Sequence, residues 1–491
     1  MYYPTLEGVK KYKKFGNRVP IYREIVADLE TPVSAFLKIN RGSNSFLLES
    51  VEGGQRLARY SFIGTEPYKV LAISGEDEVD SLPLIAKELR KYKVVPVEGL
   101  PRFTGGAIGY LAYETVTRLE ELPSPSSNPL SLPESLFMFV DTMLVFDHVT
   151  HKIKVLSHVR LDGDIEAAYQ KATEKIDALI DRLNRPLPSS QHTGSRAAQH
   201  RNNHEFSSNF SKEDFVKSVL KIKQYIAAGE AIQVVLSQRL ARRTEASPFE
   251  IYRALRTINP SPYMFFLDFN SSHIIGASPE ILVRVEDGKV MTRPLAGTRS
   301  RGRTLAEDTM LEQELRGDEK ERAEHIMLVD LGRNDIGRIS EPGTVEVSDL
   351  MDVERYSHVM HLVSHVQGKL RRDLTVFDAL RSCFPAGTVS GAPKIRAMEI
   401  IAELEHEKRG PYAGAVGYFS YSGNMDMAIA IRTIVMIKDI AYMQAGAGIV
   451  YDSVPEHEYE ESMNKARALL KAINQAESPV SERLSHAVAD R

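Results

Sequence analysis

Two pairs of glutamates stand at helical spacing in the second half of the chain. Glu321 and Glu324 lie in the segment GDEKERAEHIMLVDL, and Glu458 and Glu461 lie in PEHEYEESMNKARALL. A spacing of three residues puts both carboxylates of a pair on one face of a helix, where a bound cation would relieve their repulsion. Oxygen ligands from two helices suit Mg²⁺, which keeps several waters. Such spacing is also common on solvated helix faces, so it leaves both interpretations open.

Two glycine-containing segments could approach an anion. The first, RPLAGTRSRG at 293–302, has three arginines around its glycine, but Ala296 stands where such loops often carry a lysine. The second, QAGAGIV at 444–450, places small residues where backbone N–H groups could contact an anion, although tight packing is the simpler explanation of one such run. A third segment, FPAGTVSGAPK at 384–394, lacks the glycine spacing of a nucleotide-binding P-loop, so we exclude that function.

Three polar residues stand in apolar or turn surroundings. Arg432 interrupts the apolar run MAIAIRTIVMI, where a charge needs either a salt bridge or a carboxylate ligand. His361 lies in VMHLVSHV, and Glu280 follows a Ser-Pro turn at the start of an apolar run. Together with the glutamates and glycines, these residues predict a cavity for a small, oxygen-rich substrate with two negative charges.

Composition excludes several classes of protein. The formal net charge of the 491 residues is −4 and the basic residues are not clustered, so nucleic-acid binding is not expected. The single cysteine, Cys383, excludes an internal disulfide framework and fits a reducing cytoplasm. The N-terminus has no apolar signal segment and no run of apolar residues is long enough to span a bilayer, so we expect a cytoplasmic protein without a membrane segment.

The clearest break in composition is at 186–210, which is rich in Ser, Asn, Gln, His and Pro and is interpreted as a linker or surface excursion. It separates an N-terminal portion, 1–185, from a larger portion, 211–478, and a tail follows at 479–491. A chain of this length needs two domains or one large two-layered body.

Hydrophobic periodicity gives the expected elements. Helices are predicted at 163–184, 211–229, 306–331, 393–408 and 456–476, and late strands at 413–421, 425–437 and 440–449. Strands and helices come in blocks rather than in strict alternation. This favours an α+β fold, a large body in which largely antiparallel β-sheets pack together with helices on the outside.

Six motifs occur in one order along the C-terminal portion. They are RPLAGTRSRG, DEKERAEHIMLVDLGRND, FPAGTVSGAPK, PYAGAVGY, IAIRT and QAGAGIVYDSVPEHEYEESMNKA. In this order they resemble the chorismate-utilising enzymes, over nearly all of 211–478, and among these the large-subunit branch of the anthranilate synthases. LLES at 47–50 and NPSPYMFF at 259–266 resemble the tryptophan feedback site of that branch, which extends the similarity to the N-terminal portion.

The resemblance implies a role for each matching residue. Glu324 and Glu461 would ligate Mg²⁺, with Glu321 and Glu458 supporting it through its waters. The residues implied to contact chorismate are Gly297, Thr298, Tyr412, Arg432, Gly446, Ala447 and Gly448, with Arg432 at the enolpyruvyl carboxylate.

The implied catalytic groups are Glu280, which would be the general acid for the departing C4 hydroxyl, and His361 and Thr388, which would assist the later loss of pyruvate. Inhibitory tryptophan would contact Ser50, Pro262, Tyr263 and Met264. Attack of ammonia on C2 as the C4 hydroxyl leaves requires a proton donor at C4, and Mg²⁺ would neutralise the ring carboxylate.

The resemblance also implies a partner. Ammonia usually comes from a glutamine amidotransferase with a nucleophilic cysteine in a Gly-x-Cys-x-Gly elbow, whereas Cys383 lies in RSCFPAGT. We therefore expect a separate glutaminase subunit. The family members that remain as alternatives, aminodeoxychorismate synthases and isochorismate or salicylate synthases, typically carry lysine where this chain has Ala296, which argues against them. A non-catalytic metabolite sensor is a further alternative.

Overall fold

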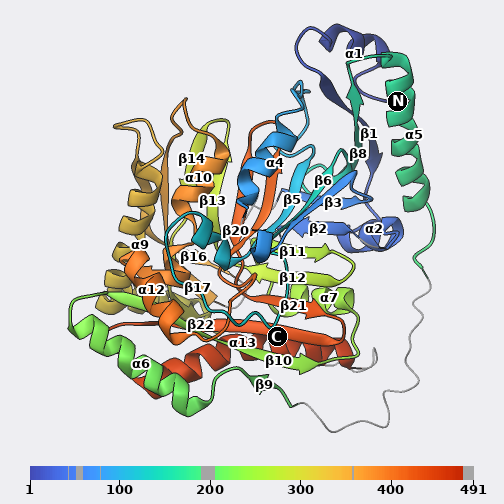
Figure 1. The fold of residues 1–491 in the computed structure, drawn as a ribbon. Helices are drawn as coiled ribbons and strands as arrows, with labels where there is room; N and C mark the ends of the chain where they lie inside the picture. The colour runs from blue at the N-terminus through green and yellow to red at the C-terminus, as the bar shows by residue number, and fades with distance from the viewer. Residues whose placement is uncertain (43, 51–58, 78, 189–204, 357–358, 479–491) are drawn as a thin grey trace.

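Two large antiparallel β-sheets form the body of the protein (Figure 1). The structure is a computed structural model and describes residues 1–42, 44–50, 59–77, 79–188, 205–356 and 359–478. The expected α+β fold with antiparallel sheets and external helices is confirmed. Within the described residues, no helix is both long and apolar enough to cross a membrane.

The larger sheet has 12 strands within the described residues and runs β1-β8-β7-β3-β2-β11-β12-β21-β22-β10-β18, with β9 paired to β10. Its strands are β1 Arg18–Val26, β2 Ser45–Glu49, β3 Tyr60–Thr65, β7 Thr142–Asp147, β8 Lys152–Arg160, β9 Ser207–Ser208, β10 Gln233–Arg243, β11 Tyr263–Asp268, β12 Ser272–Ser278, β18 Gly391–Ala392, β21 Thr433–Ile437 and β22 Ile440–Ile449.

The second sheet has 10 strands within the described residues and runs β15-β17-β14-β13-β20-β19-β5-β6-β4, with β16 paired to β17. Its strands are β4 Lys69–Ile73, β5 Gly106–Leu111, β6 Ser135–Val140, β13 Ile281–Glu286, β14 Lys289–Thr292, β15 Leu295–Ser300, β16 Glu346–Arg355, β17 Val359–Lys369, β19 Ala415–Ser420 and β20 Met425–Ile429.

Alternation along the strands explains why the sheets pack face to face. In β5 and β6, Ile108 and Met138 belong to a core shared with Phe62 and Phe265 of the larger sheet, whereas their neighbours, among them Phe137, belong to a second core under helices. Both faces of these strands are therefore buried, and both sheets combine strands from the N-terminal and C-terminal portions. The composition break at 186–210 does not separate two independent sheets, and most of that segment lies outside the described residues.

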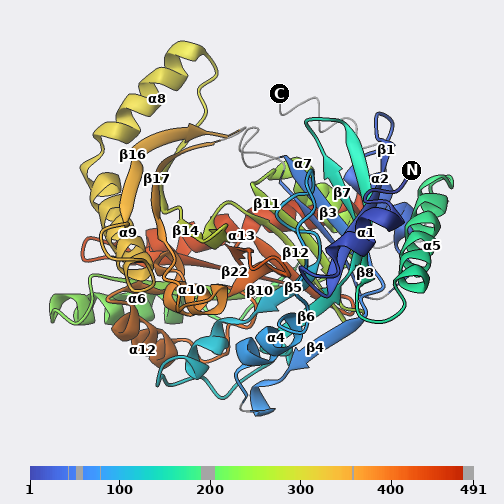
Figure 2. The same cartoon turned by 90° about the horizontal axis from the view of Figure 1, so that it is seen from above.

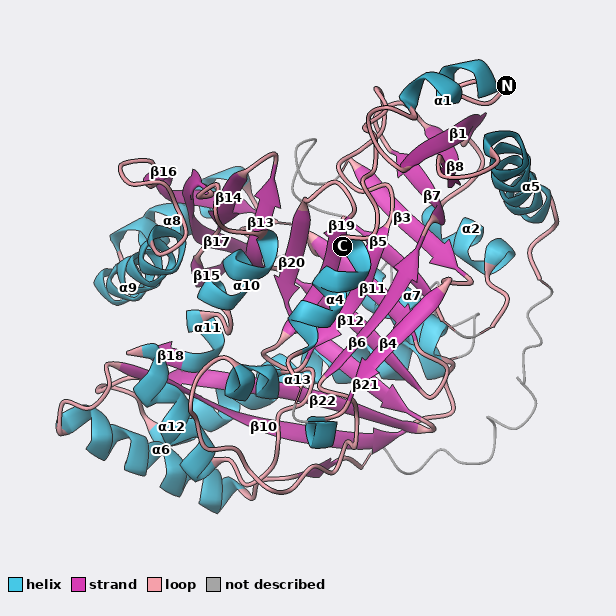
Figure 3. Ribbon diagram, turned by 45° about the horizontal axis from the view of Figure 1, so that its top comes forward, coloured by secondary structure: helices cyan, strands magenta, loops and turns pink. Residues whose placement is uncertain are grey.

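Helices cover the outer faces of the sheets (Figure 3). They are α1 Leu6–Tyr12, α2 Pro32–Ile39, α4 Ser81–Leu89, α5 Ile165–Leu183, α6 Lys212–Ala227, α7 Pro248–Ile258, α8 Leu305–Gly317, α9 Glu319–Gly337, α10 Val376–Cys383, α11 Gly387–Ser390, α12 Lys394–Leu404 and α13 Pro455–Glu477, with 3-10 turns η1 Gly75–Asp77 and η2 Tyr113–Arg118. In Figure 2, α8 and α9 lie along β16 and β17, on the opposite side of the molecule from α5.

Two expected elements are each divided in the structure. The single helix expected at 306–331 is two helices, because Asp318 leaves the helical conformation and caps α9 by accepting hydrogen bonds from the N–H groups of Lys320 and Glu321. The strand expected at 425–437 is β20 of one sheet and β21 of the other, with Arg432 between them at φ +51°. Because both strands are buried, the run of apolar residues continues through the crossover, and hydrophobic periodicity gives no sign of the break between the two strands.

Candidate active site

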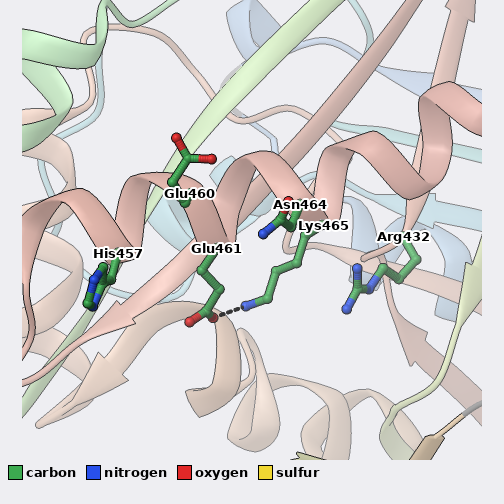
Figure 4. A pocket seen from close by; sticks show the side chains of 6 residues that line it. All are labelled: Arg432, His457, Glu460, Glu461, Asn464 and Lys465. Carbon is green, nitrogen blue, oxygen red and sulfur yellow. Dashed lines mark ion pairs between the residues drawn. The ribbon is translucent and has the colours of Figure 1, made fainter. Parts of the chain in front are cut away.

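The crossover from one sheet to the other places Arg432 beside α13 (Figure 4). Arg432, His457, Glu460, Glu461, Asn464 and Lys465 line an open pocket of about 510 Å³. Glu461 and Lys465 extend from the same side of α13, and Lys465 Nζ lies 2.7 Å from Glu461 Oε1. The helix, predicted from the sequence at 456–476, is held in place by its buried apolar side chains, which include Met463, Ala466, Leu470 and Ile473.

Arg432 has no ion pair with a carboxylate among the residues that the structure describes. Burial lowers the pKa of its guanidinium, while Tyr412 and Glu461 act in the opposite direction. Arg432 is half-buried, and a partly desolvated cation without a paired carboxylate is costly unless a ligand supplies one. Of the two interpretations that the sequence left open, the described residues contain no structural salt bridge, so the arrangement favours an anionic ligand at Arg432.

The first glutamate pair lies on α9, as its spacing predicted. Arg299 donates from Nη1 to Glu321 Oε1 at 3.2 Å, and Gln233 donates from Nε2 to Glu324 Oε1 at 3.1 Å. Burial raises the pKa of Glu321 and the charge of Glu324 adds to the rise, although Arg299 opposes it. The repulsion inferred from the spacing is therefore present in the folded chain.

The second pair lies on the first turns of α13. Burial raises the pKa of Glu458, and the charge of Glu461 raises it further, while Ser453, Lys320 and Lys465 lower it. Lys320 stands at the start of α9, so the first turns of α9 and α13 lie within electrostatic reach of each other. The two glutamate pairs are therefore carried by the first turns of two separate helices.

The chemistry of this donor set fits a hard divalent cation, because it offers only carboxylate oxygens and each pair is under mutual repulsion. However, no group of three or more acidic, histidine or cysteine side chains in the described ranges is close enough to form a ligand set. Glu321, Glu324 and Glu461 instead contact Arg299, Gln233 and Lys465. Binding a cation requires these contacts to be exchanged for metal ligation.

Glu280 lies between β12 and β13, with only 7% of its surface exposed. Burial raises the pKa of its carboxyl to about 8, although Thr388 and Arg293 oppose the rise. Glu280 and Thr388 line one small cavity with Asp335, Cys383 and Ile429. The Thr388 hydroxyl is buried and forms no hydrogen bond of ordinary geometry within the described residues, so its effect on Glu280 is one of proximity. Glu280 is therefore a protonated acid at neutral pH.

His361 lies on β17 and faces the turn of β15. Its Nδ1 is 2.8 Å from the carbonyl oxygen of Gly297 and 3.1 Å from Thr298 Oγ1. Burial, together with the charges of Arg432 and Arg293, lowers the pKa of His361, so the ring is neutral at neutral pH. A carbonyl oxygen only accepts, so Nδ1 carries the hydrogen and Nε2 keeps the lone pair.

Gly297 stands at a bulge in β15, where the pairing with β17 shifts between Ala296 and Arg299. Its φ is +64°, and a Cβ there would lie 2.9 Å from Leu315 Cδ1 and 3.2 Å from Glu321 Oε2. Glycine is therefore required both by the backbone conformation and by the close approach of the Glu321 carboxylate.

The run Gly446 to Gly448 lies on β22 opposite β10. A Cβ on Gly446 would be 3.0 Å from Tyr412 Oη, and one on Gly448 would be 2.5 Å from Gln233 Nε2. The glycines therefore let Tyr412 and Gln233 approach the strand, and packing accounts for this run without an anion. Lys465 Nζ donates to the carbonyl oxygen of Gly446 at 2.9 Å.

Two residues of this site were not identified from the sequence. Gln233 joins the Gly448 backbone to Glu324, and Lys465 joins Glu461 to Gly446. Lys465 could have been found because it stands four residues after Glu461 on the same helix face. Gln233 carried no such signal, because its partners are distant in sequence.

The candidate inhibitor residues also meet. Met264 of β11 pairs with Glu49 of β2, which brings Tyr263, the first residue of β11, and Ser50, the residue after β2, to the same end of this strand pair. Pro262 and Met264 are buried, and the Tyr263 hydroxyl donates to Asp426 Oδ1 at 3.0 Å and accepts from Arg284 at 2.9 Å. The strand pairing therefore joins the two motifs that the sequence placed more than two hundred residues apart.

Comparison with known proteins agrees with this arrangement. The chain is 52% identical over 490 residues to anthranilate synthase component 1 of Acetivibrio thermocellus, covering 97% of this chain and 99% of the relative. It is 48% identical over 492 residues to the protein of the same name from Aquifex aeolicus, covering 97% and 99%.

Solved structures share the fold. Anthranilate synthase component I from Streptococcus pneumoniae matches with a TM-score of 0.74 at 38% identity, covering 91% of this chain and 99% of that chain. The menaquinone-specific isochorismate synthase of Escherichia coli matches with a TM-score of 0.70 at 20% identity, covering 95% and 98%, which shows likeness of fold alone. The family of chorismate binding enzymes matches over residues 43–471. The chain therefore belongs to the chorismate-binding enzymes.

Proposed function

We propose that this chain is the large subunit of an anthranilate synthase, which converts chorismate and ammonia to anthranilate, pyruvate and water. The observation that carries the proposal is a site that combines Arg432, a cation without a paired carboxylate in the described residues, with the protonated acid Glu280 and the neutral base His361. The identity of 46–52% to several relatives named anthranilate synthase component 1 supports it.

Substrate binding rests on charge. Arg432 pairs with the enolpyruvyl carboxylate of chorismate, while Gly297, Thr298, Tyr412 and the run Gly446, Ala447 and Gly448 shape the rest of the site. Glu324 and Glu461 would hold Mg²⁺, with Glu321 and Glu458 acting through its waters. When bound, Mg²⁺ would neutralise the ring carboxylate.

The first step adds ammonia at C2 and breaks the bond from C4 to its hydroxyl, which leaves as water. Glu280 supplies the proton for that water, because its buried carboxyl holds a proton at neutral pH. The second step removes the C2 proton and releases the enolpyruvyl group as pyruvate, which makes the ring aromatic. His361, with its lone pair on Nε2, and Thr388 assist that elimination.

The nitrogen comes from a separate glutamine amidotransferase subunit. Burial raises the pKa of the Cys383 thiol, so the only cysteine of this chain is a buried thiol rather than a nucleophilic thiolate. Free ammonia serves as a poorer substitute for the partner. The net charge and the reduced cysteine fit a cytoplasmic enzyme.

The second site, at Ser50, Pro262, Tyr263 and Met264, binds tryptophan as a feedback inhibitor. Its support is that the two motifs meet at one end of the β2 and β11 pair, beside the buried side chains of Pro262 and Met264.

The test is incubation with chorismate, Mg²⁺ and ammonium at alkaline pH, followed by fluorescence detection of anthranilate. Anthranilate and pyruvate in equal amounts are expected, and omission of ammonium or Mg²⁺ should abolish both. Isochorismate or salicylate as the product would assign the chain to the isochorismate or salicylate synthases, and aminodeoxychorismate would assign it to the aminodeoxychorismate synthases. No product at all would support a non-catalytic metabolite sensor.

A further inference from the structure

Arg409 is the largest side chain among those fully buried in the described residues, with 2% of its surface exposed. It follows α12 and uses its guanidinium in four hydrogen bonds. Nε and Nη2 donate to Glu405 at 2.7 and 2.6 Å, Nη1 donates to the carbonyl oxygen of Val389 at 2.7 Å, and Nη2 donates to that of Val235 at 2.8 Å. Only a guanidinium can satisfy a carboxylate and two separate carbonyls in this way.

Glu405, which is 4% exposed, extends the same network. Its Oε1 accepts from the backbone N–H of Ser237 at 2.8 Å and from the Ser237 hydroxyl at 2.9 Å. Gln444 Nε2 also donates to that hydroxyl at 2.8 Å, and Glu114 accepts from the Arg409 N–H at 2.6 Å. The ion pair is therefore held from several sides.

The carbonyl and N–H groups that this pair binds belong to two stretches next to the proposed active site, α11 and β10, and the segment that carries Arg409 is a third. Val389 follows Thr388 directly. Val235 and Ser237 lie on β10 opposite Gly448 and Gly446 of β22. Arg409 itself precedes Tyr412 by three residues, and its guanidinium carbon lies 5.7 Å from the centre of the Tyr412 ring. One buried ion pair thus contacts the supports of Thr388, Tyr412 and the glycine run.

We propose that the ion pair of Arg409 and Glu405 is a positioning element for chorismate, which fixes the distances between Thr388, Tyr412 and the Gly446 to Gly448 strand. The pair is buried behind these residues and touches the chain rather than the substrate. A displacement of about 1 Å at a reacting group can cost about 100-fold in rate, so loss of one carbonyl contact is enough to impair turnover. This inference rests on the proposed function.

A second ion pair with a buried arginine provides a control. Arg239, which is 5% exposed, pairs with the half-buried Glu407 and donates to the carbonyl oxygen of Lys408 at 3.0 Å. It joins the same two elements, β10 and the segment after α12, but within the described residues it makes no hydrogen bond to Val235 or to α11. A general need for a buried, paired arginine would affect both variants alike.

The experiment compares Arg409→Lys with Arg239→Lys in the full chain. Lysine keeps the charge but cannot reach two carbonyls and both carboxylate oxygens at once. We expect Arg409→Lys to raise KM for chorismate and to lower kcat/KM by about 100-fold at a temperature where circular dichroism shows a folded protein. Arg239→Lys should keep KM and kcat/KM within about twofold of the wild type, because the change leaves the surface of the active site unaltered.

Two outcomes would overturn the proposal: wild-type kinetics in folded Arg409→Lys, or equal losses in the two variants. If Arg409→Lys does not fold, Ser237→Ala replaces it, because that change removes one hydroxyl contact of Glu405. The Ser237→Ala variant should still raise KM for chorismate several-fold, and an unchanged KM would count against the proposal. If the wild type makes no anthranilate, the proposed function fails. Calorimetric titration with chorismate then tests the positioning role separately, because chorismate should bind Arg409→Lys more weakly than it binds the wild type or Arg239→Lys.

Discussion

Ala296 lies directly opposite Leu362 in the ladder of β15 and β17, one residue from His361 on the neighbouring strand. Only 7% of its surface is exposed, and it precedes the bulge at Gly297. The position is therefore a buried methyl group beside a catalytic candidate, in a region where Arg293 and Arg432 already supply positive charge.

Ala296→Lys should abolish anthranilate formation. A lysine there adds a buried cation near two arginines, and its long side chain must displace neighbouring groups close to His361, so a loss of about 100-fold or more in kcat is expected. Product analysis with ammonium as nitrogen donor measures it, and Ala296→Met, similar in length but uncharged, separates bulk from charge. Full retention of anthranilate synthesis by the lysine variant would discard this role for Ala296.

Above about pH 8, kcat should fall with the slope expected for loss of a single proton, because the raised pKa of Glu280 marks the pH at which the proton donor is lost. The measurement is kcat as a function of pH at constant concentration of free ammonia, so that ammonia itself does not shape the profile. Glu280→Gln should lose about 100-fold or more in kcat, and its residual activity should lack that alkaline limb. The same limb in both proteins would point to another group.

The raised pKa of Glu280 also predicts how the free energy of unfolding changes with pH. Between its ordinary value of 4.5 and about 8, the folded chain holds a proton that the unfolded chain has released. The contribution of this group to the free energy of unfolding therefore decreases as pH rises through that range. Glu280→Gln should flatten that part of the stability profile in chemical denaturation, and an unchanged slope would contradict the assignment.

Glu324→Ala should abolish turnover that depends on Mg²⁺. Its carboxylate accepts from Gln233 and stands beside Glu321, so its loss removes one of the two ligands that we propose for the cation. Equilibrium dialysis should show at least about tenfold weaker Mg²⁺ binding, as expected when a ligand is removed. Glu319→Ala, an exposed change on the same helix, is the control, and unchanged Mg²⁺ dependence of Glu324→Ala would remove Glu324 from the site.

Ser50→Phe should relieve inhibition by tryptophan and spare catalysis. Ser50 follows β2 at the same end of the strand pair as Tyr263, so a phenyl ring there competes for the space that we propose for the indole. We expect the tryptophan concentration for half-inhibition to rise by about tenfold or more while kcat stays near that of the wild type. Ser207→Phe, on the exposed edge of β9, controls for an added ring, and retained inhibition in Ser50→Phe would refute the assignment.

Local sequence patterns were sufficient for much of the fold. The helices α6 and α13 and the strand β22 lie where periodicity predicted them, because each depends on residues only a few positions apart. The break at Asp318 was missed because charged residues continue on both sides of it. The crossover at Arg432 was missed because two strands buried in different sheets form one apolar run.

Residue types and motif order determined the family, the α+β class and the candidate residues, since spacing on a helix fixes a face and long ordered motifs are specific. Only the tertiary structure decided which of these residues meet, because the contacts join segments hundreds of residues apart. It brought Ser50 and Tyr263 to the same end of one strand pair, left Arg432 without a paired carboxylate in the described residues and buried Glu280 enough to keep its proton. It also placed Arg409 behind the site, where burial and hydrogen-bond geometry, rather than sequence spacing, give that arginine its role.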